Sequence, residues 1–177
     1  MKPVKLTISG LNSFETAQTI DFEALSSKGL FGIFGPTGSG KSTIIDGIVM
    51  SLYGPGSMPR GTKDFINTEC EQAELEFIFR TAVEGVVREI EIRRVFRRSG
   101  EGYRSHQSRL VVRSLEGEIL QIEDKQGEVN HGIQDILGLS DSEFLKMVVL
   151  PQGKFSEFIQ LDPRDRRNML QNLFGLE

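Results

Sequence analysis

The chain has 177 residues, of which 38% are hydrophobic, so its length and composition suit one globular domain with a core of ordinary size. Its net charge of −4 argues against a general nucleic-acid coat, and its single cysteine, Cys70, excludes an internal disulfide or a CxxC metal pair. Since no signal peptide is recognisable and no run approaches the roughly 18 apolar residues of a membrane span, we expect a cytoplasmic protein without membrane attachment.

Strand signals dominate the first part of the chain. Residues 4–11 ("VKLTISGL") and 17–22 ("AQTIDF") predict two strands joined by a turn, and residues 29–35 ("GLFGIFG") predict a third, more fully buried strand. Apolar residues then recur at helical spacing from Lys41 to about Tyr53, until the helix breakers of "YGPGSMPRG". The predicted order is therefore strand, glycine-rich loop and helix.

Three segments of alternating apolar and polar residues follow, and they predict an antiparallel sheet beside the strand, loop and helix. They are residues 73–80, 86–98 and 108–122, separated by turns such as "RRSGEGYRSHQS". Residues 88–113 carry eight arginines and three glutamates, a net charge of +5, which leaves −9 for the rest of the chain. A basic region on an acidic protein is a local feature that the overall charge hides.

The last fifty residues predict helices. The segments are residues 127–139, residues 142–150 behind Ser140 or Asp141 as N-cap, residues 154–161, and residues 162–177, where Asp162 and Pro163 form a typical helix start.

Residues 35–42 contain a complete phosphate-binding motif. Gly35, Gly40, Lys41 and Ser42 match G-x-x-x-x-G-K-[ST] in the strand, loop, helix order that the motif requires. The glycines let successive N–H groups point at a polyphosphate, and the helix N-terminus adds its positive dipole end. Lys41 would reach the β- and γ-phosphates and Ser42 would ligate Mg²⁺, so we expect ATP and Mg²⁺ as ligands. The expected nucleotide contacts are Gly35, Pro36, Thr37, Gly38, Ser39, Gly40, Lys41, Ser42 and Thr43.

Hydrolysis needs more than this motif, in particular an acidic residue at a strand end that holds the metal. The nearest apolar run ending in acids, "ILQIED" at residues 119–124, is interrupted by Gln121. The segment "LSDSE" at residues 139–143 lacks the glycines of an ABC signature and more simply caps a helix. The hydrolytic machinery is therefore incomplete in this sequence.

Gln152, in "KMVVLPQGKFSEFI", is a second candidate site residue. A glutamine that leaves an apolar segment on a short loop can place its amide oxygen on Mg²⁺ and its amide nitrogen near an attacking water. Taken alone, an ordinary surface glutamine is the simpler interpretation.

Taken together, these segments closely resemble the bacterial SbcC family, the ATPase subunit of the SbcCD nuclease, within the wider class of structural-maintenance-of-chromosomes ATPases. The resemblance extends over the whole chain. It is carried by "LNSF" and "IDF" (Leu11–Phe14 and Ile20–Phe22), by "GLFGIFGPTGSGKSTIIDGIVMSLYG" (Gly29–Gly54), and by "VVLPQGKFSEFI" (Val148–Ile159).

The resemblance implies an α/β fold, namely half of an ABC-type ATPase head with a mixed sheet, an adjoining antiparallel segment and a helical C-terminal part. Residues 1–177 would be the N-terminal lobe, with the phosphate-binding motif and the Q-loop, whereas the coiled coil and the C-terminal lobe would lie elsewhere in the protein. Lys41 and Gln152 would act in catalysis, and Ser42 and Gln152 would hold the metal. The implied partners are the C-terminal lobe, a second head in a homodimer, an SbcD-type nuclease and double-stranded DNA.

The implied function is that of a DNA-processing ATPase that gates an associated exonuclease and endonuclease in double-strand break repair and hairpin cleavage. The chain alone should be almost inactive. Related heads contact the nucleotide from a loop after the first helix, which points to Arg60 and Lys63, although solvated loop charges are a common alternative. No nucleotide role is expected for Asn12, Ser13 or Phe14, where some relatives place an arginine.

The arginine-rich segment predicts a strand pair whose exposed face contacts DNA phosphates, with Arg97, Arg98 and Arg104 as the expected contacts. The alternative is that these arginines pair with strand glutamates such as Glu89 and Glu91 on a solvated sheet face.

Two other functions compete with the ATPase head. A free-standing P-loop kinase or phosphotransferase could use the arginine hairpin as a lid, but it should carry an acid at a strand end and no Q-loop. A DNA-binding module with a vestigial phosphate loop is disfavoured by the complete motif.

Overall fold

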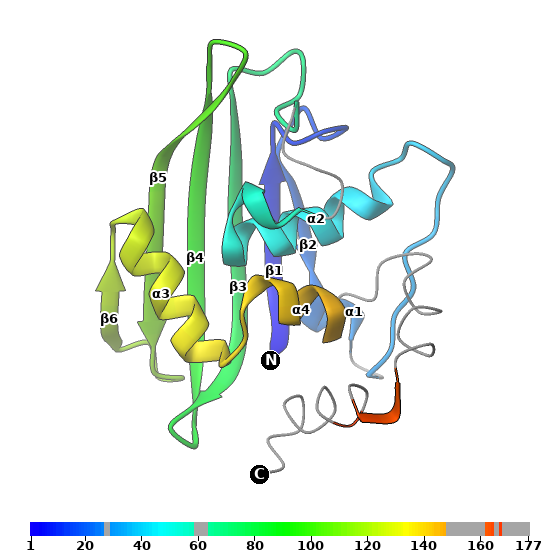
Figure 1. Ribbon diagram of the computed structural model, residues 1–177. Coiled ribbons are helices and arrows are strands. Elements are labelled where there is room, and N and C mark those ends of the chain that lie inside the picture. The colour runs from blue at the N-terminus through cyan, green and yellow to red at the C-terminus, as the bar shows by residue number, and fades with distance from the viewer. Residues whose placement is uncertain (27–28, 59–63, 148–161, 165–166, 168–177) are drawn as a thin grey trace. The chain divides into compact units, whose positions relative to one another are not determined.

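Long strands with alternating buried and exposed side chains build the main sheet of the protein (Figure 1). The computed structural model describes residues 1–26, 29–58, 64–147, 162–164 and 167. Backbone contacts divide the chain into two compact units, Met1–Gly138 and Leu139–Glu177, and the sheet belongs to the first. Its strands are β1 (Lys2–Ser9), β2 (Gln18–Asp21), β3 (Gln72–Val83), β4 (Val86–Ser99), β5 (Gly102–Arg113) and β6 (Ile119–Glu123).

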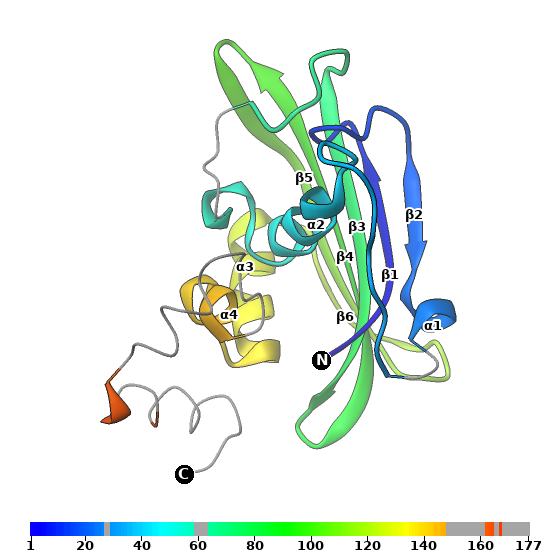
Figure 2. The same cartoon turned by 90° about the vertical axis from the view of Figure 1, so that its right-hand side faces the viewer.

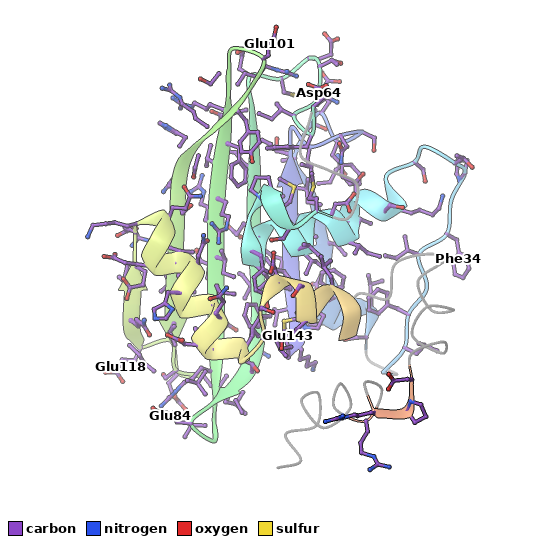
Figure 3. All side chains as sticks on the ribbon, in the orientation of Figure 1. Phe34, Asp64, Glu84, Glu101, Glu118 and Glu143 are labelled. Carbon is purple, nitrogen blue, oxygen red and sulfur yellow. The ribbon has the colours of Figure 1, made fainter. Side chains whose placement is uncertain are left out.

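The strands lie in the order β2-β1-β3-β4-β5-β6, and each neighbouring pair is antiparallel. The N-terminal strands therefore continue the long hairpins in one sheet, because β1 pairs directly with β3, with Leu6 opposite Phe77. The hairpin turn between β4 and β5 and the turn between β3 and β4 lie at opposite ends of this sheet, as the labelled Glu101 and Glu84 show (Figure 3).

Two helices cover one face of the sheet (Figure 2). Helix α2 (Lys41–Tyr53) packs across β1, β3 and β4, and α3 (Gln126–Leu137) packs on β5, β3 and β6. A short helix, α1 (Phe22–Leu25), lies against β1, and a 3-10 turn (Pro55–Ser57) follows α2. The core between helices and sheet is mostly apolar, and includes Leu6, Ile8, Val49, Met50, Leu52, Leu75, Phe77, Phe79, Ile90, Ile92, Leu110, Val129 and Ile133.

The second unit begins with α4 (Asp141–Met147). Ser140 and Glu143 form a capping box, in which the Glu143 N–H donates to Ser140 Oγ (3.4 Å) and the Ser140 N–H donates to Glu143 Oε2 (2.8 Å). Further along, the Arg164 N–H donates to Asp162 Oδ1 (2.8 Å), and Pro163 and Arg164 are helical. The structure thus confirms Ser140 as N-cap and a helix start at Asp162. None of the helices in the described residues has the length and apolar character needed to span a membrane.

Several sequence predictions are confirmed in this fold. The strands over 4–11 and 17–22 correspond to β1 and β2, the helix from Lys41 to Tyr53 is α2, and the helix over 127–139 is α3.

Other predictions are wrong. Residues 29–35 form no strand, since no described strand lies beside them to supply a hydrogen-bond ladder. The sheet of the described residues is antiparallel rather than mixed for the same reason. The polar segment "YRSHQS" belongs to β5 instead of a loop, because pairing with β4 continues to Ser99 opposite Gly102, and residues 108–122 divide into β5 and β6.

Gly10, directly after β1, fixes how the first strand connects to the rest of the sheet. It has a left-handed backbone with φ +64°, its carbonyl accepts the Asn67 N–H (2.9 Å), and a Cβ at this position would overlap the backbone oxygen of Gln72 in β3. Only glycine meets both conditions without displacing a strand.

We expect Gly10→Ala to lower the free energy of unfolding by about 3 kcal/mol or more, because left-handed strain and a backbone overlap act together. Gly85→Ala is the matched control, since Gly85 has φ +78° with nothing within 4 Å of its added Cβ, and it should cost only about 1 kcal/mol. Urea unfolding followed by circular dichroism measures both values, and equal losses would contradict the packing assigned to Gly10.

Candidate functional site

The N-terminus of α2 has the properties of an anion site. Its N-cap is Gly40, with φ +88°, and the helix has neither a side-chain cap hydrogen bond nor an acidic residue in its first turn. The first N–H groups of a helix have no partner within the helix, and the aligned peptide dipoles make this end positive. These donors are therefore available to a phosphate, with no carboxylate in that turn to repel it.

The side chain of Lys41 folds back onto the backbone of the phosphate loop, residues 35–40. Its Nζ donates to the carbonyl oxygens of Gly35 (2.7 Å) and Pro36 (2.6 Å), and the Ser39 N–H donates to the Pro36 carbonyl (3.3 Å). Among the described residues, the Lys41 ammonium group thus donates to two loop carbonyls, and it can exchange them for phosphate oxygens, which are stronger charge-assisted acceptors. The structure thus places Lys41 within reach of any anion bound at the helix start.

The next two residues of the motif also begin α2. Ser42 is half-buried and Thr43 is buried in the first helical turn. Hydroxyl oxygens, together with phosphate oxygens and water, suit the oxygen coordination that Mg²⁺ requires, so Ser42 fits the role of a metal ligand. In the parts of the chain that are described, no three His, Cys, Asp or Glu side chains gather at one point.

A tight turn of residues 11–14, called the N-terminal turn below, packs closely against Gly40 at the end of the phosphate loop. A Cβ added to Gly40 would lie 2.8 Å from Phe14 Cζ and 3.0 Å from Ser13 Oγ. Two backbone hydrogen bonds between Leu11 and Phe14 (2.8 and 3.1 Å) close the turn. The sequence predicted only a turn here and no role at the nucleotide, and no local signal reveals a contact made between residues so far apart in the chain.

Hydrogen bonds to Phe65 and Asn67 hold the N-terminal turn in place. The Asn12 N–H donates to the Phe65 carbonyl (2.8 Å), and Asn67 Nδ2 donates to the Asn12 carbonyl (2.6 Å). Arg98, on β4, donates to the carbonyls of Cys70, Ile66 and Asn67 at 2.8–2.9 Å and so fixes the segment that holds the turn.

The segment before the phosphate loop exposes large apolar side chains. Leu30 is 85% exposed and Phe34 is 92% exposed, and Figure 3 shows the Phe34 side chain pointing away from the sheet. Phe31 is partly sheltered by Phe22, with ring centroids 5.6 Å apart. A buried strand was expected here, so this is the stretch in which sequence pattern and structure differ most.

Three of the eight arginines in residues 88–113 form ion pairs on the outer face of the sheet, which is the face away from α2 and α3, and so does Arg80 just before this region. The pairs are Arg80 with Glu89 (3.0 Å) and Glu23 (2.7 Å), Arg93 with Glu74 (3.2 Å), Arg109 with Asp124 (3.3 Å) and Arg113 with Glu91 (2.6 Å), beside Lys5 with Glu76 (3.0 Å). For these arginines the geometry agrees with the alternative of glutamate pairing.

Two arginines at the β4–β5 hairpin differ from these ion-paired ones. Arg97 lies opposite Arg104 in the register, and no carboxylate of the described residues lies within ion-pairing distance of either. Arg97 Nε donates only to the neutral Gln72 Oε1 (3.1 Å), and Arg104 is exposed. Like charges directly opposite each other on neighbouring strands are unfavourable, so this pair favours an anionic partner. Arg98 instead directs its guanidinium to backbone carbonyls, as described above.

Three expected site residues, Gln152, Arg60 and Lys63, lie outside the described residues, so their assigned roles stay predictions.

Known proteins resemble this chain along its whole length. The AAA domain family matches residues 5–177. The SbcC subunit of the SbcCD nuclease of Clostridium acetobutylicum is 46% identical over 178 residues, and that of Bacillus subtilis is 42% identical over 179 residues; both alignments cover the whole chain but only 15% and 16% of the relatives. A probable DNA double-strand break repair Rad50 ATPase of Aquifex aeolicus is 34% identical over 182 residues, covering the whole chain and 17% of that protein. The chain thus spans about a sixth of the length of these relatives.

We expect Gly40→Ala to weaken Mg·ATP binding by at least about tenfold, because the added methyl group overlaps Phe14 and displaces the helix start. The second substitution Phe14→Ala should restore much of the affinity. In Gly38→Ala, where φ is +86° but nothing lies within 4 Å of the added Cβ, Phe14→Ala should restore none. Isothermal titration calorimetry on these four variants, on Phe14→Ala alone and on the unchanged protein gives the coupling, and equal effects of Phe14→Ala in both glycine-variant backgrounds would contradict the contact.

Proposed function

Because the chain belongs to the AAA domain family, we propose that it is the ATP-binding N-terminal lobe of an ATPase that works in a DNA repair nuclease complex. The observation that carries the proposal is the start of α2, where a left-handed glycine, uncapped N–H donors and Lys41 meet without a carboxylate in the first turn. Relatives named as part of a nuclease and as a probable double-strand break repair ATPase support the repair context.

The chain's own residues would bind and orient the nucleotide. Lys41 would release the carbonyls of Gly35 and Pro36 and donate to phosphate oxygens, while first-turn N–H groups of α2 donate alongside it. Ser42 would offer its hydroxyl oxygen to Mg²⁺, and Gln152 would supply an amide oxygen from the Q-loop. Bound Mg·ATP would supply the phosphoryl group for transfer to water.

The remaining parts of the active site would come from the C-terminal lobe of the same protein. The exposed apolar segment at residues 30–34 supports this, since covering Leu30 and Phe34 would contribute about 1.5–3 kcal/mol each. A strand laid beside this segment would also supply the hydrogen-bond ladder that it lacks among the described residues. Strand β6 ends in Glu123, but Gln121 interrupts its apolar run, so the sequence of the chain agrees with this division.

In the assembled protein, two such heads would close on each other around nucleotide. Closure would gate an SbcD-type nuclease that acts in double-strand break repair and on DNA hairpins. Segments that a γ-phosphate and its Mg²⁺ hold in one of two states are a common switching device, and Gln152 is the proposed sensor here.

A free-standing P-loop kinase or phosphotransferase is not favoured. The relatives reported above are nuclease and repair proteins rather than kinases.

The isolated chain should bind Mg·ATP weakly and hydrolyse it negligibly, because it holds the phosphate loop without the acid and signature of a complete site. Adding the C-terminal lobe of the parent protein should raise kcat by at least about 100-fold, and Lys41→Ala should remove binding in both preparations. Phosphate release and calorimetry measure these quantities. Full turnover by the isolated chain, abolished by Lys41→Ala, would contradict the split head.

We propose the β4–β5 hairpin as the contact for double-stranded DNA. Of the two arginine pairs that face each other across β4 and β5, Arg93 and Arg109 each have a carboxylate partner, whereas Arg97 and Arg104 have none among the described residues. Phosphates of a duplex would relieve the repulsion between Arg97 and Arg104. The hydrogen bonds of Arg98 to three backbone carbonyls support a structural role for that residue instead.

In the assembled head, replacing Arg97 and Arg104 by glutamine should weaken duplex binding and make the slope of log affinity against log salt less negative by about 1.8, since each lost phosphate contact removes about 0.9. Replacing Arg93 and Arg109 by glutamine is the matched control and should leave the slope nearly unchanged, because both are already neutralised. Fluorescence anisotropy over a salt series measures the slopes. Equal changes in the two variants would refute the assignment of the hairpin.

A further inference from the structure

Arg94 is a charged residue buried completely in the core of the first unit. It is 0% exposed and is the largest of the fully buried side chains in the described residues. It extends from β4 toward the helices, whereas its neighbour Arg93 is on the outer face with 46% of its side chain exposed. Arginine is rarely buried without a specific set of partners.

The partners of Arg94 are the last turn of α2 and one residue of α3. Nε donates to the Ser51 carbonyl (2.7 Å), and Nη2 donates to the Leu52 carbonyl (2.9 Å) and to Asn130 Oδ1 (2.8 Å). Nη1 makes a longer contact with Ser108 Oγ on β5 (3.4 Å). One guanidinium therefore joins two strands and two helices.

These contacts complete the C-terminus of α2. The last carbonyls of a helix have no intrahelical donor. The Gly54 N–H donates to the Met50 carbonyl (2.9 Å), and Arg94 supplies donors to the next two carbonyls. The negative end of the helix dipole stabilises the positive charge, in place of the carboxylate that is absent from the described surroundings of Arg94. Burial lowers the pKa of Arg94 to about 10, so the residue stays cationic at neutral pH.

Arg94 is too far from the phosphate loop to attract a phosphate directly. A helix of 13 residues is about 20 Å long, and at that separation the Coulomb attraction between two unit charges is weak at the effective dielectric constant of a protein. Any effect of Arg94 on the nucleotide must therefore pass through the position of α2 itself. At its other end, α2 meets the N-terminal turn at Gly40, where little space is left.

We propose that Arg94 is a positioning residue for nucleotide binding. By fixing the last turn of α2 to β4 and α3, it sets where the helix lies along its own axis, and so where Gly40, Lys41 and Ser42 stand against Phe14. This inference rests on the proposed ATP-binding function. A misplacement of about 1 Å can lower the rate of an enzymatic reaction about 100-fold, which shows how strongly such contacts depend on position.

The test compares Mg·ATP dissociation constants, measured by calorimetry on the full-length protein, with urea midpoints measured without nucleotide. Arg94→Met should raise the dissociation constant at least about tenfold in the folded protein. Arg94→Lys keeps the charge, but a single nitrogen cannot reach both carbonyls and Asn130 in the same geometry, so its loss should be intermediate. Arg93→Met, one residue away on the other face, is the matched control and should change the constant by less than about twofold.

The outcomes separate positioning from simple stabilisation. Lower urea midpoints with an unchanged dissociation constant in both Arg94 variants would overturn the inference and leave the proposed function standing. If Arg94→Met does not fold, Arg94→Lys decides, and native affinity in that variant would overturn the inference. If the unchanged protein itself does not bind Mg·ATP, the proposed function fails and the inference with it.

Discussion

The packing of α2 against the apolar face of the sheet is the constraint on which the site depends. Burying Val49, Met50 and Leu52 contributes about 1.5–3 kcal/mol for each side chain, which exceeds the roughly 0–1 kcal/mol of a surface ion pair. Because this face of the helix is fixed, its N-terminus is held beside the N-terminal turn with its donors uncapped. Gly40 packs against the N-terminal turn at one end of α2, and Arg94 binds the last carbonyls at the other end. We propose that these two contacts set the position of the helix along its axis.

The two faces of the sheet carry different kinds of side chain. The inner face supplies the core, whereas the outer face carries a ladder of ion pairs that adds little stability but neutralises Arg93, Arg109 and Arg113. Two surface features do not fit this division into a core face and an ion-paired face. They are the like-charged pair of Arg97 and Arg104, and the exposed apolar segment that includes Phe34. In the proposed function, a phosphate backbone completes the first surface and the C-terminal lobe completes the second.

Local patterns predicted the local structure around α2 well. The spacing of apolar residues predicted the bounds of the helix, and the motif from Gly35 to Ser42 predicted a glycine-rich loop at its start, because both signals lie within a few turns of chain. The anion site assigned to this motif stays a prediction. The sequence pattern could not show that residues 29–35 have no neighbouring strand among the described residues. A hydrogen-bond ladder needs a strand alongside, and that strand can lie far away in the chain. The pattern also could not distinguish the arginines that bind backbone carbonyls, Arg94 and Arg98, from Arg97 and Arg104. Which acids, carbonyls and helices lie beside each arginine depends on the strand register and on tertiary packing.

The rest of the proposed function depends on the binding of ATP phosphates at the start of α2. Hydrogen exchange of the full-length protein, followed by mass spectrometry with and without Mg·ATP, tests it most directly, since bound phosphates would protect the N–H groups that α2 leaves uncapped. We expect slower exchange in peptides covering Gly38–Thr43 when Mg·ATP is present, and no such slowing in Lys41→Ala. Unchanged exchange in those peptides at saturating Mg·ATP would contradict the account.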